Sequence, residues 1–172
     1  MQTFLPFADI ERSARSLDNK RLGKQRVEVL QLLHIALRAS IQSDGGAIWF
    51  EPTVAPSPGW RRHPAFLMWQ AHPWALAQYG LAICAAWQQR GFADTIGRRL
   101  AFAAANAPFC AQTAHRWPHW IGDDAFHYSH RANLSRKDPR HYLPLFPDVD
   151  IVTAPVWPYV WPTTTLPQEP LV

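Results

Sequence analysis

Cysteine and charged residues are both scarce in this chain of 172 residues. Its two cysteines, Cys84 and Cys110, are too few for a four-cysteine zinc site or a disulfide framework. No apolar run approaches the ~18 residues of a membrane span. The start, MQTFLPFADIERSAR, lacks the basic and then apolar pattern of a secretory signal. These absences exclude a disulfide scaffold and a membrane protein, and predict a cytoplasmic location in a reducing compartment.

Motifs for cofactors and metals are also missing. There is no Gly-rich phosphate loop, so no nucleotide cofactor is expected. The pairs His115/His119 and His127/His130 have helix-compatible metal spacing, but no cysteine or clear carboxylate ligand supports them. Pro118 also interrupts the first pair. The sequence therefore predicts neither a metal nor a cofactor.

Positive charge is concentrated in the first 140 residues. No Lys or Arg follows Arg140, so residues 1–140 carry 17 basic and 10 acidic side chains, a net charge of +7. Such a body attracts polyanions by long-range steering. Charge also serves solubility, and composition alone does not separate the two interpretations.

Apolar spacing and capping residues predict mostly helices. Asp18 is a good N-cap for a long helix, Asp123 or Asp124 caps another, and Gly91 ends a third. Pro64 or Pro73 can each open a helix at its first position. The expected helices span residues 9–16, 18–40, 73–91, 93–106 and 122–137.

No convincing strand pattern is found, so the fold class predicted is all-α. Residues 43–64 are expected to form a long irregular loop, of the length that is often functional. We predict a compact single-domain helical bundle over residues 1–147, with long loops. A Pro- and Trp-rich extended tail, 148–172, then packs on the body. Alternation of Trp157, Tyr159 and Trp161 is compatible with one side of the tail lying on that body.

The segment LDNKRLGKQRVEVLQLL, residues 17–33, places a single acid, Glu28, among several bases. On a helical wheel, Arg21 and Lys24 fall within about 60° of Glu28, as do Gln25 and Gln31, while leucines gather on the far side.

Two interpretations of this polar stripe stay open. Lys24 and Glu28 could form an ordinary exposed i,i+4 pair. Alternatively, Glu28 stays ionised beside phosphate-binding bases and stabilises positive charge on a bound sugar, or removes a proton from it. Arg26 falls within the apolar stripe. It therefore snorkels to solvent, pairs with a buried acid or reaches into a cleft.

Two further groups are candidates for DNA contacts. The first would form a phosphate-contacting surface and comprises His127, His130, Arg131, Arg136 and Lys137. The second is Trp60-Arg61-Arg62, in which an aromatic wedge would be joined to two phosphate clamps. The alternative for the second group is that Trp60 packs the loop down while both arginines stay in water.

Several segments resemble the pyrimidine-dimer DNA glycosylases, the endonuclease V type of phage and bacteria. LD-x3-L-x3-R-x-E with its apolar continuation is similar to the family's first helix. The pieces HPAFLMWQAHPWAL (63–76), RGFADT (90–95) and GDDAFHYS (122–129) follow in the family's order. The resemblance covers roughly residues 1–145, in patches.

The resemblance implies a compact helical domain that binds double-stranded DNA, flips a nucleotide, cuts the glycosidic bond and performs β-elimination as an AP lyase. Glu28 matches the family's catalytic glutamate. The nucleophile implied is the N-terminal α-amine, here that of Met1. Val27 stands where the family often has Arg, and the start Met1-Gln2-Thr3 differs from the Thr exposed in the phage enzyme.

The first hypothesis is therefore a cofactor-free DNA-repair glycosylase, cytoplasmic and nucleoid-associated. Met1 and Glu28 would be catalytic, and Arg21, Lys24 and Arg26 would hold the DNA backbone. Val27 and the altered start favour a second hypothesis, a non-catalytic helical DNA-binding protein that keeps the fold. A third is an interaction protein whose Trp-rich tail docks a protein partner. That tail is interpreted as a strap over the core or, by analogy with the phage enzyme, a base-stacking element. The oligomeric state is left open.

Overall fold

The computed structural model describes residues 2–53, 61–106, 117–151 and 158–162. Within these ranges the chain forms seven helices and one two-stranded antiparallel sheet. None of the helices in these ranges combines the length and the apolar character needed to cross a lipid bilayer. In chain order the elements are α1 (Ile10–Ser16), α2 (Asn19–Leu37), β1 (Ala39–Asp44), β2 (Ala47–Pro52), α4 (Pro64–Leu67), α5 (Pro73–Gln89), α6 (Gly97–Asn106), α8 (Asp124–Lys137) and α9 (Pro139–Tyr142).

The hairpin shows that the all-α prediction was wrong. The helix expected over 18–40 ends at Leu37, because Arg38 turns into the left-handed region with φ 52°. β1 then pairs with β2 in a register that sets Ile41 opposite Phe50. Gly45 and Gly46, both at positive φ, form the two-residue turn that such hairpins favour. The irregular loop expected over 43–64 thus contains a strand and the first residue of α4.

The capping predictions fared better. Asp18 accepts a hydrogen bond from the Arg21 N–H and caps α2, and Asp123 caps α8 through the N–H groups of Ala125 and Phe126. Pro64 and Pro73 each stand at the start of a helix, α4 and α5 respectively. These local signals are confirmed because a cap depends on groups within one helical turn.

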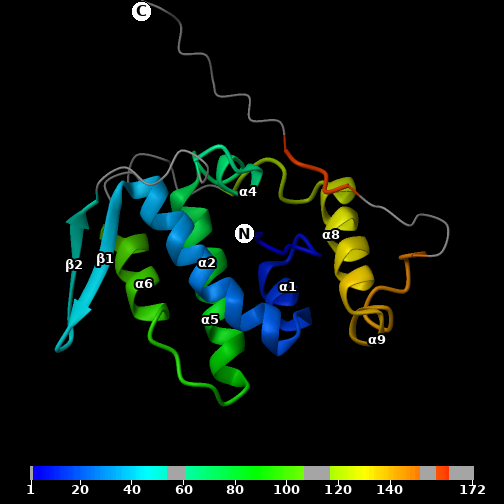
Figure 1. The fold of residues 1–172 in the computed structure, drawn as a ribbon, viewed down its shortest axis with the longest axis horizontal. Coiled ribbons are helices and arrows are strands. Elements are labelled where there is room, and N and C mark those ends of the chain that lie inside the picture. The colour runs from blue at the N-terminus through cyan, green and yellow to red at the C-terminus, as the bar shows by residue number, and fades with distance from the viewer. Residues whose placement is uncertain (1, 54–60, 107–116, 152–157, 163–172) are drawn as a thin grey trace, which may run out of the picture.

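α2 and α5 pack side by side at the centre of the molecule, with α6 and the hairpin to one side (Figure 1). Gly80 of α5 makes the close approach possible. A Cβ there would lie 2.6 Å from Val29 of α2 and 2.7 Å from Leu100 of α6. Phe50 of β2 packs on Phe102 of α6 at 4.9 Å between ring centroids, which attaches the hairpin to the body.

α8 and α9 lie on the other side of α2 and α5, and the first residues of the chain run between the two groups (Figure 1). Of the predicted tail beyond residue 147, the structure describes 148–151 and 158–162. Tyr159 and Trp161 pack against the core, and the Val160 N–H donates to Ser129 Oγ of α8 at 3.1 Å. Trp157 lies outside the described residues. The division at residue 147 stays a prediction.

Candidate nucleic-acid site

The segment of residues 2–7 has no regular secondary structure, yet most of it is buried. Side chains from other elements satisfy its backbone. The Phe4 N–H donates to Gln25 Oε1 at 3.1 Å, and the Phe4 carbonyl accepts from the Tyr79 hydroxyl at 3.0 Å. The Leu5 N–H donates to His130 Nδ1 at 3.2 Å, and the Leu5 carbonyl contacts His127 Nδ1 at 2.8 Å.

The same pattern continues to the start of α1. The Pro6 carbonyl accepts from Arg131 Nη1 at 2.8 Å. Ser13 Oγ accepts from the Phe7 N–H and donates to the Phe7 carbonyl. Since buried backbone groups without partners are costly, this set of side chains defines one path for residues 4–7. The start of the chain is thereby fixed between α2, α5 and α8.

His127 and His130, expected on a phosphate-contacting surface, lie in the interior at 2% and 0% exposure. His127 Nε2 accepts from the Gly122 N–H, so its Nδ1 carries the proton donated to Leu5. Burial lowers the pKa of His127. Burial, together with repulsion from His127 in its protonated form and from Lys137, lowers the pKa of His130 to about 3. Both rings are therefore neutral anchors of the Leu5 backbone at neutral pH.

Gln25 links this segment to the candidate acid. Its side chain is buried at 1% exposure. Its Nε2 donates to the Gln2 carbonyl and, at 2.8 Å, to Glu28 Oε2, while its Oε1 accepts from Phe4 and, at 2.8 Å, from the Tyr79 hydroxyl. The wheel placed Gln25 in the polar stripe but gave it no role. Its position three residues before Glu28 was the signal that could have identified it.

Glu28 is buried at 7% exposure. The expectation of an ordinary exposed ion pair therefore holds for Lys24 but not for Glu28. Lys24 Nζ lies 3.7 Å from Glu28 Oε1, and the Lys24 side chain is 71% exposed while that of Glu28 is 9% exposed. The Glu28 carboxylate is thus held inside the protein, and the solvated ammonium group of Lys24 lies beside it. Burial of an acid with hydrogen-bonding partners is more typical of a functional site than of a surface pair.

A cleft of about 430 Å³ opens over this arrangement. We call it the Glu28 cleft; it is lined by Gln2, Phe4, Lys20, Arg21, Lys24, Gln25, Glu28, Lys137 and Tyr159. Four of these side chains are cationic and one is acidic. The structure therefore brings together four predicted site residues, Arg21, Lys24, Glu28 and Lys137. It adds Lys20, Gln25 and Tyr159, which sequence reasoning had not assigned to the site.

Arg21 is held in a fixed position in this wall. Asp18 pairs with its guanidinium, and the Tyr142 hydroxyl donates to the same carboxylate. Burial raises the pKa of Asp18, but the hydrogen bonds from Tyr142 and Arg21 outweigh it and lower the value to about 2. The Arg21 guanidinium also lies 5.4 Å from the centre of the Tyr142 ring. This cation is therefore preorganised, unlike the exposed Lys24.

Tyr159 and Lys137 also line the cleft. Lys137 Nζ donates to the Tyr159 hydroxyl at 3.2 Å. Burial, with the charges of Arg21 and Arg136, lowers the pKa of Lys137, and burial raises the pKa of Tyr159 to about 12. The Tyr159 ring also packs on His130 at 5.3 Å between centroids. One aromatic residue of the tail thus reaches the cleft while packing against the core.

The other predicted DNA contacts lie elsewhere. Arg26 is bound to the buried Asp94 and stacks on Trp87 at 4.4 Å, so of its three interpretations the structure has the buried pair. Arg131 pairs with Asp148 at 2.8 Å and holds Pro6. The remaining basic candidates are Arg61 in a second pocket and the exposed Arg62 and Arg136. Met1 and Trp60 lie outside the described residues.

Comparison with known proteins gives one match. The family model for pyrimidine dimer DNA glycosylase matches residues 1–99, a range that includes residues 2–7, all of α2 and Glu28. No curated protein and no solved structure matches the chain. The matched range exceeds half of the chain, and the resemblance found in the sequence is confirmed. The chain belongs to the pyrimidine dimer DNA glycosylase family, whose role is in DNA repair.

Proposed function

We propose that this protein cleaves damaged double-stranded DNA as a glycosylase and AP lyase through an imine on its N-terminal amine. The observation that carries the proposal is the Gln25 side chain, which bonds both the Gln2 carbonyl and Glu28. Gln2 itself lines the Glu28 cleft, so the second residue of the chain lies beside the buried acid. An N-terminal amine and a buried carboxylate are the two groups that this chemistry requires.

In the proposed reaction the Met1 amine attacks C1′ of the damaged nucleotide, and the glycosidic bond breaks with its electrons leaving on the base. An α-amine suits this step because its pKa of ~7.7–8.0 leaves part of it neutral at pH 7. Glu28 stabilises positive charge on the sugar. The sugar ring opens as the amine loses a proton, which gives the imine.

Glu28 then assists removal of a proton from C2′. The electrons of that C–H bond form a C1′–C2′ double bond conjugated with nitrogen. They then shift to C2′–C3′ as the C3′–O bond breaks, so that the 3′ phosphate leaves and the C1′–nitrogen imine forms again. Water hydrolyses the imine and releases the amine. No step needs a metal or a redox cofactor, because the amine supplies the nucleophile and the carboxylate exchanges the proton.

The walls of the Glu28 cleft suit a phosphate backbone. Lys20, Arg21, Lys24 and Lys137 surround one acid, and cations that replace condensed counterions dominate affinity for DNA. Val27, where the resembled family often carries Arg, is 43% exposed and does not line the cleft. Arg21, fixed by Asp18, supplies a guanidinium to the cleft from a position more than one helical turn before Val27.

Borohydride trapping tests the proposal. Protein of verified N-terminal mass would be mixed with duplex DNA carrying a pyrimidine dimer or an abasic site, and then reduced with sodium borohydride. We expect a covalent adduct whose peptide map places the DNA on the N-terminal amine. A matched control is the same protein with its N-terminus acetylated, which should give no adduct.

Two outcomes would contradict the proposal. The absence of an adduct with either DNA would remove the imine mechanism and leave the non-catalytic DNA-binding hypothesis. An adduct mapped to Lys20, Lys24 or Lys137 would keep the lyase chemistry and reassign the nucleophile to a lysine of the cleft.

A further inference from the structure

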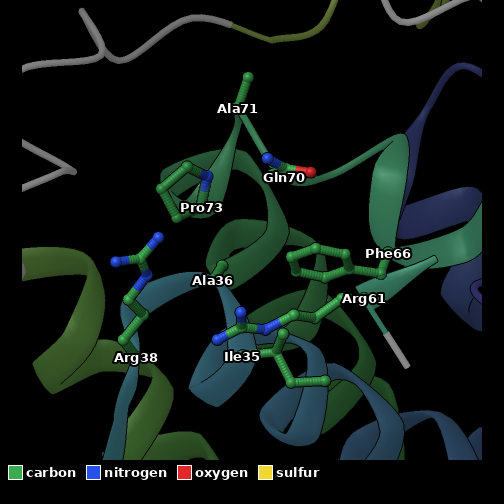
Figure 2. A pocket seen from close by; sticks show the side chains of 8 residues that line it. All are labelled: Ile35, Ala36, Arg38, Arg61, Phe66, Gln70, Ala71 and Pro73. Carbon is green, nitrogen blue, oxygen red and sulfur yellow. The ribbon is translucent and has the colours of Figure 1, made fainter. Parts of the chain in front are cut away.

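A second pocket of about 500 Å³ lies at the C-terminal end of α2. We call it the Arg38 pocket; Figure 2 shows the residues that line it, Ile35, Ala36, Arg38, Arg61, Phe66, Gln70, Ala71 and Pro73. Arg38 and Arg61 extend into it from opposite sides, with Phe66 and Pro73 beside them. No acid is among the lining residues. Two guanidiniums beside apolar and aromatic side chains form a surface suited to an anion that carries a hydrophobic part.

The backbone at Arg38 does not favour an arginine. With φ 52°, this residue is the left-handed C-cap of α2, a position where glycine or asparagine is usual and where any Cβ carries a steric cost. Neither Arg38 nor Arg61 is in an ion pair with an acid of the described ranges. A cation near a helix C-terminus gains some stability, but that gain does not require both guanidiniums to extend into the same space, as they do here.

The position of this pocket relative to the Glu28 cleft indicates which part of a bound DNA it could contact. Ile35 follows Glu28 by seven residues, so the two lie on the same face of α2, ~10.5 Å apart along the helix. With α2 along the axis of the duplex, that is about three base-pair steps at an axial rise of ~3.4 Å each. His63, the N-cap of α4 two residues after Arg61, is within electrostatic range of Glu28: burial lowers its pKa, and the charge of Glu28 opposes that shift.

We propose that the Arg38 pocket binds a phosphodiester group of the DNA backbone, about three nucleotides from the nucleotide held in the Glu28 cleft. Arg38 and Arg61 take the phosphate from opposite sides, while Phe66 and Pro73 contact its sugar. This inference rests on the proposed function, because it takes the Glu28 cleft as the place of the reacting nucleotide.

The test combines two arginine substitutions with trimmed DNA. Binding would be measured for duplexes that carry one abasic analogue resistant to cleavage, and each flank would be shortened in turn to about two base pairs, less than the spacing inferred. Arg38→Ala with Arg61→Ala should weaken binding to the full duplex about tenfold or more and reduce the salt slope by about two. When the flank that reaches the pocket is shortened, the wild type should lose the same affinity and the double variant should lose none.

Arg15→Ala is the control for the loss of one guanidinium, because Arg15 is an exposed residue of α1 outside both pockets. Its effect should be small and independent of trimming. The inference would be overturned if the double variant bound every duplex, full or shortened, more weakly than the wild type by the same factor. It would also be overturned if the double variant bound every duplex as tightly as the wild type. Competition by inorganic phosphate or a mononucleotide that is stronger than competition by duplex DNA would also overturn it, in favour of a site for a free anion.

Borohydride trapping of the wild type, run in parallel, separates this inference from the proposed function. If the wild type is trapped but the effect of the arginine substitutions does not depend on which flank is shortened, only the proposal for the Arg38 pocket is rejected. If that dependence is found but no adduct is trapped, only the imine chemistry is rejected. The thermal stability of each variant shows whether a loss of binding reflects unfolding.

Discussion

The Glu28 cleft and the Arg38 pocket lie on one face of α2 and are both basic, but they are built differently. In the cleft, Gln25 and Arg21 are bound to several partners, and the acid is buried. In the pocket, Arg38 and Arg61 are in no ion pair with a described acid, and the walls are apolar. A reacting group must be held in one geometry, which requires such networks. A phosphate contact needs charge and access, so two arginines that no described acid pairs with suffice.

Substitution of Glu28 is expected to have the largest effect on the cleft. Glu28→Gln keeps the size and an oxygen that can accept from Gln25, but removes the charge. If Glu28 is catalytic, single-turnover cleavage should fall by about 10²-fold or more, the usual scale for acid–base groups. Binding should hold or tighten, because a carboxylate that repels phosphate is gone. Cleavage at the wild-type rate would make Glu28 a structural residue.

Loss of Gln25 should affect both folding and reaction. Gln25→Leu leaves the buried Phe4 N–H without its acceptor, and takes one partner each from Tyr79 and Glu28. We expect the free energy of unfolding to fall by about 2–5 kcal/mol, since each buried group left unpaired costs ~1–3 kcal/mol.

Denaturant unfolding would measure that loss, and trapping at a temperature where the variant is folded would measure the chemistry. Gln31→Leu is the matched control, because Gln31 is exposed on the same helix. If Gln25→Leu were as stable and as active as Gln31→Leu, the network around Gln25 would not position the start of the chain.

Acid should destabilise the fold through the buried histidines, among them His130, which holds the start of the chain. The pKa of His130 is about 3 in the folded chain against an ordinary 6.5, so below pH 6.5 the unfolded chain binds the proton that the folded chain excludes. The free energy of unfolding should therefore fall by ~1.4 kcal/mol per pH unit for each such histidine as the pH drops from 6.5 towards 3.

Urea unfolding between pH 7 and pH 4 would measure this slope. His34, whose pKa burial and the charge of Arg99 lower to about 4, adds to it. His130→Gln can still accept the Leu5 N–H and should flatten the slope, whereas His141→Gln, at an exposed site, should not. A slope that His130→Gln leaves unchanged would contradict the neutral anchor.

The left-handed residue of the Arg38 pocket allows stability and binding to be separated. Arg38→Gly should be more stable than Arg38→Ala by about 1 kcal/mol, because glycine has no Cβ to clash at positive φ. Both variants should bind DNA equally and more weakly than the wild type. Thermal melting and a binding isotherm for each would measure this. Equal stability of the two variants would mean that the backbone at Arg38 is not strained.

The smallest expected effect is at the mouth of the Glu28 cleft. Lys24→Ala removes a side chain that is 71% exposed, so stability should change by less than about 0.5 kcal/mol. Binding should weaken a few-fold, and the salt slope should fall by about one phosphate contact. Titrations at several salt concentrations would measure both. An unchanged slope would place the DNA elsewhere than over Lys24.

The sequence by itself predicted what depends on neighbours within a helical turn. Asp18 and Asp123 as caps and Pro73 as a helix start are local patterns, and the structure has them as predicted. The family resemblance also came from the order of short motifs. The hairpin was missed although SDGGAIWF contains a Gly-Gly turn, because its strands pack on distant parts of the chain, as Phe50 does on Phe102, and β-propensity depends on such packing.

Only the tertiary structure decided which basic and aromatic residues face the cleft. Arg26, Arg131, His127 and His130 have the composition of a phosphate surface, but partners up to 125 residues away in the chain hold the arginines against the body and the histidines inside it. The sequence could not supply those partners, since hydrogen bonds and desolvation depend on distance in space. For the same reason the chain start, extended and without a pattern, became identifiable as part of the site only when α2, α5 and α8 enclosed it.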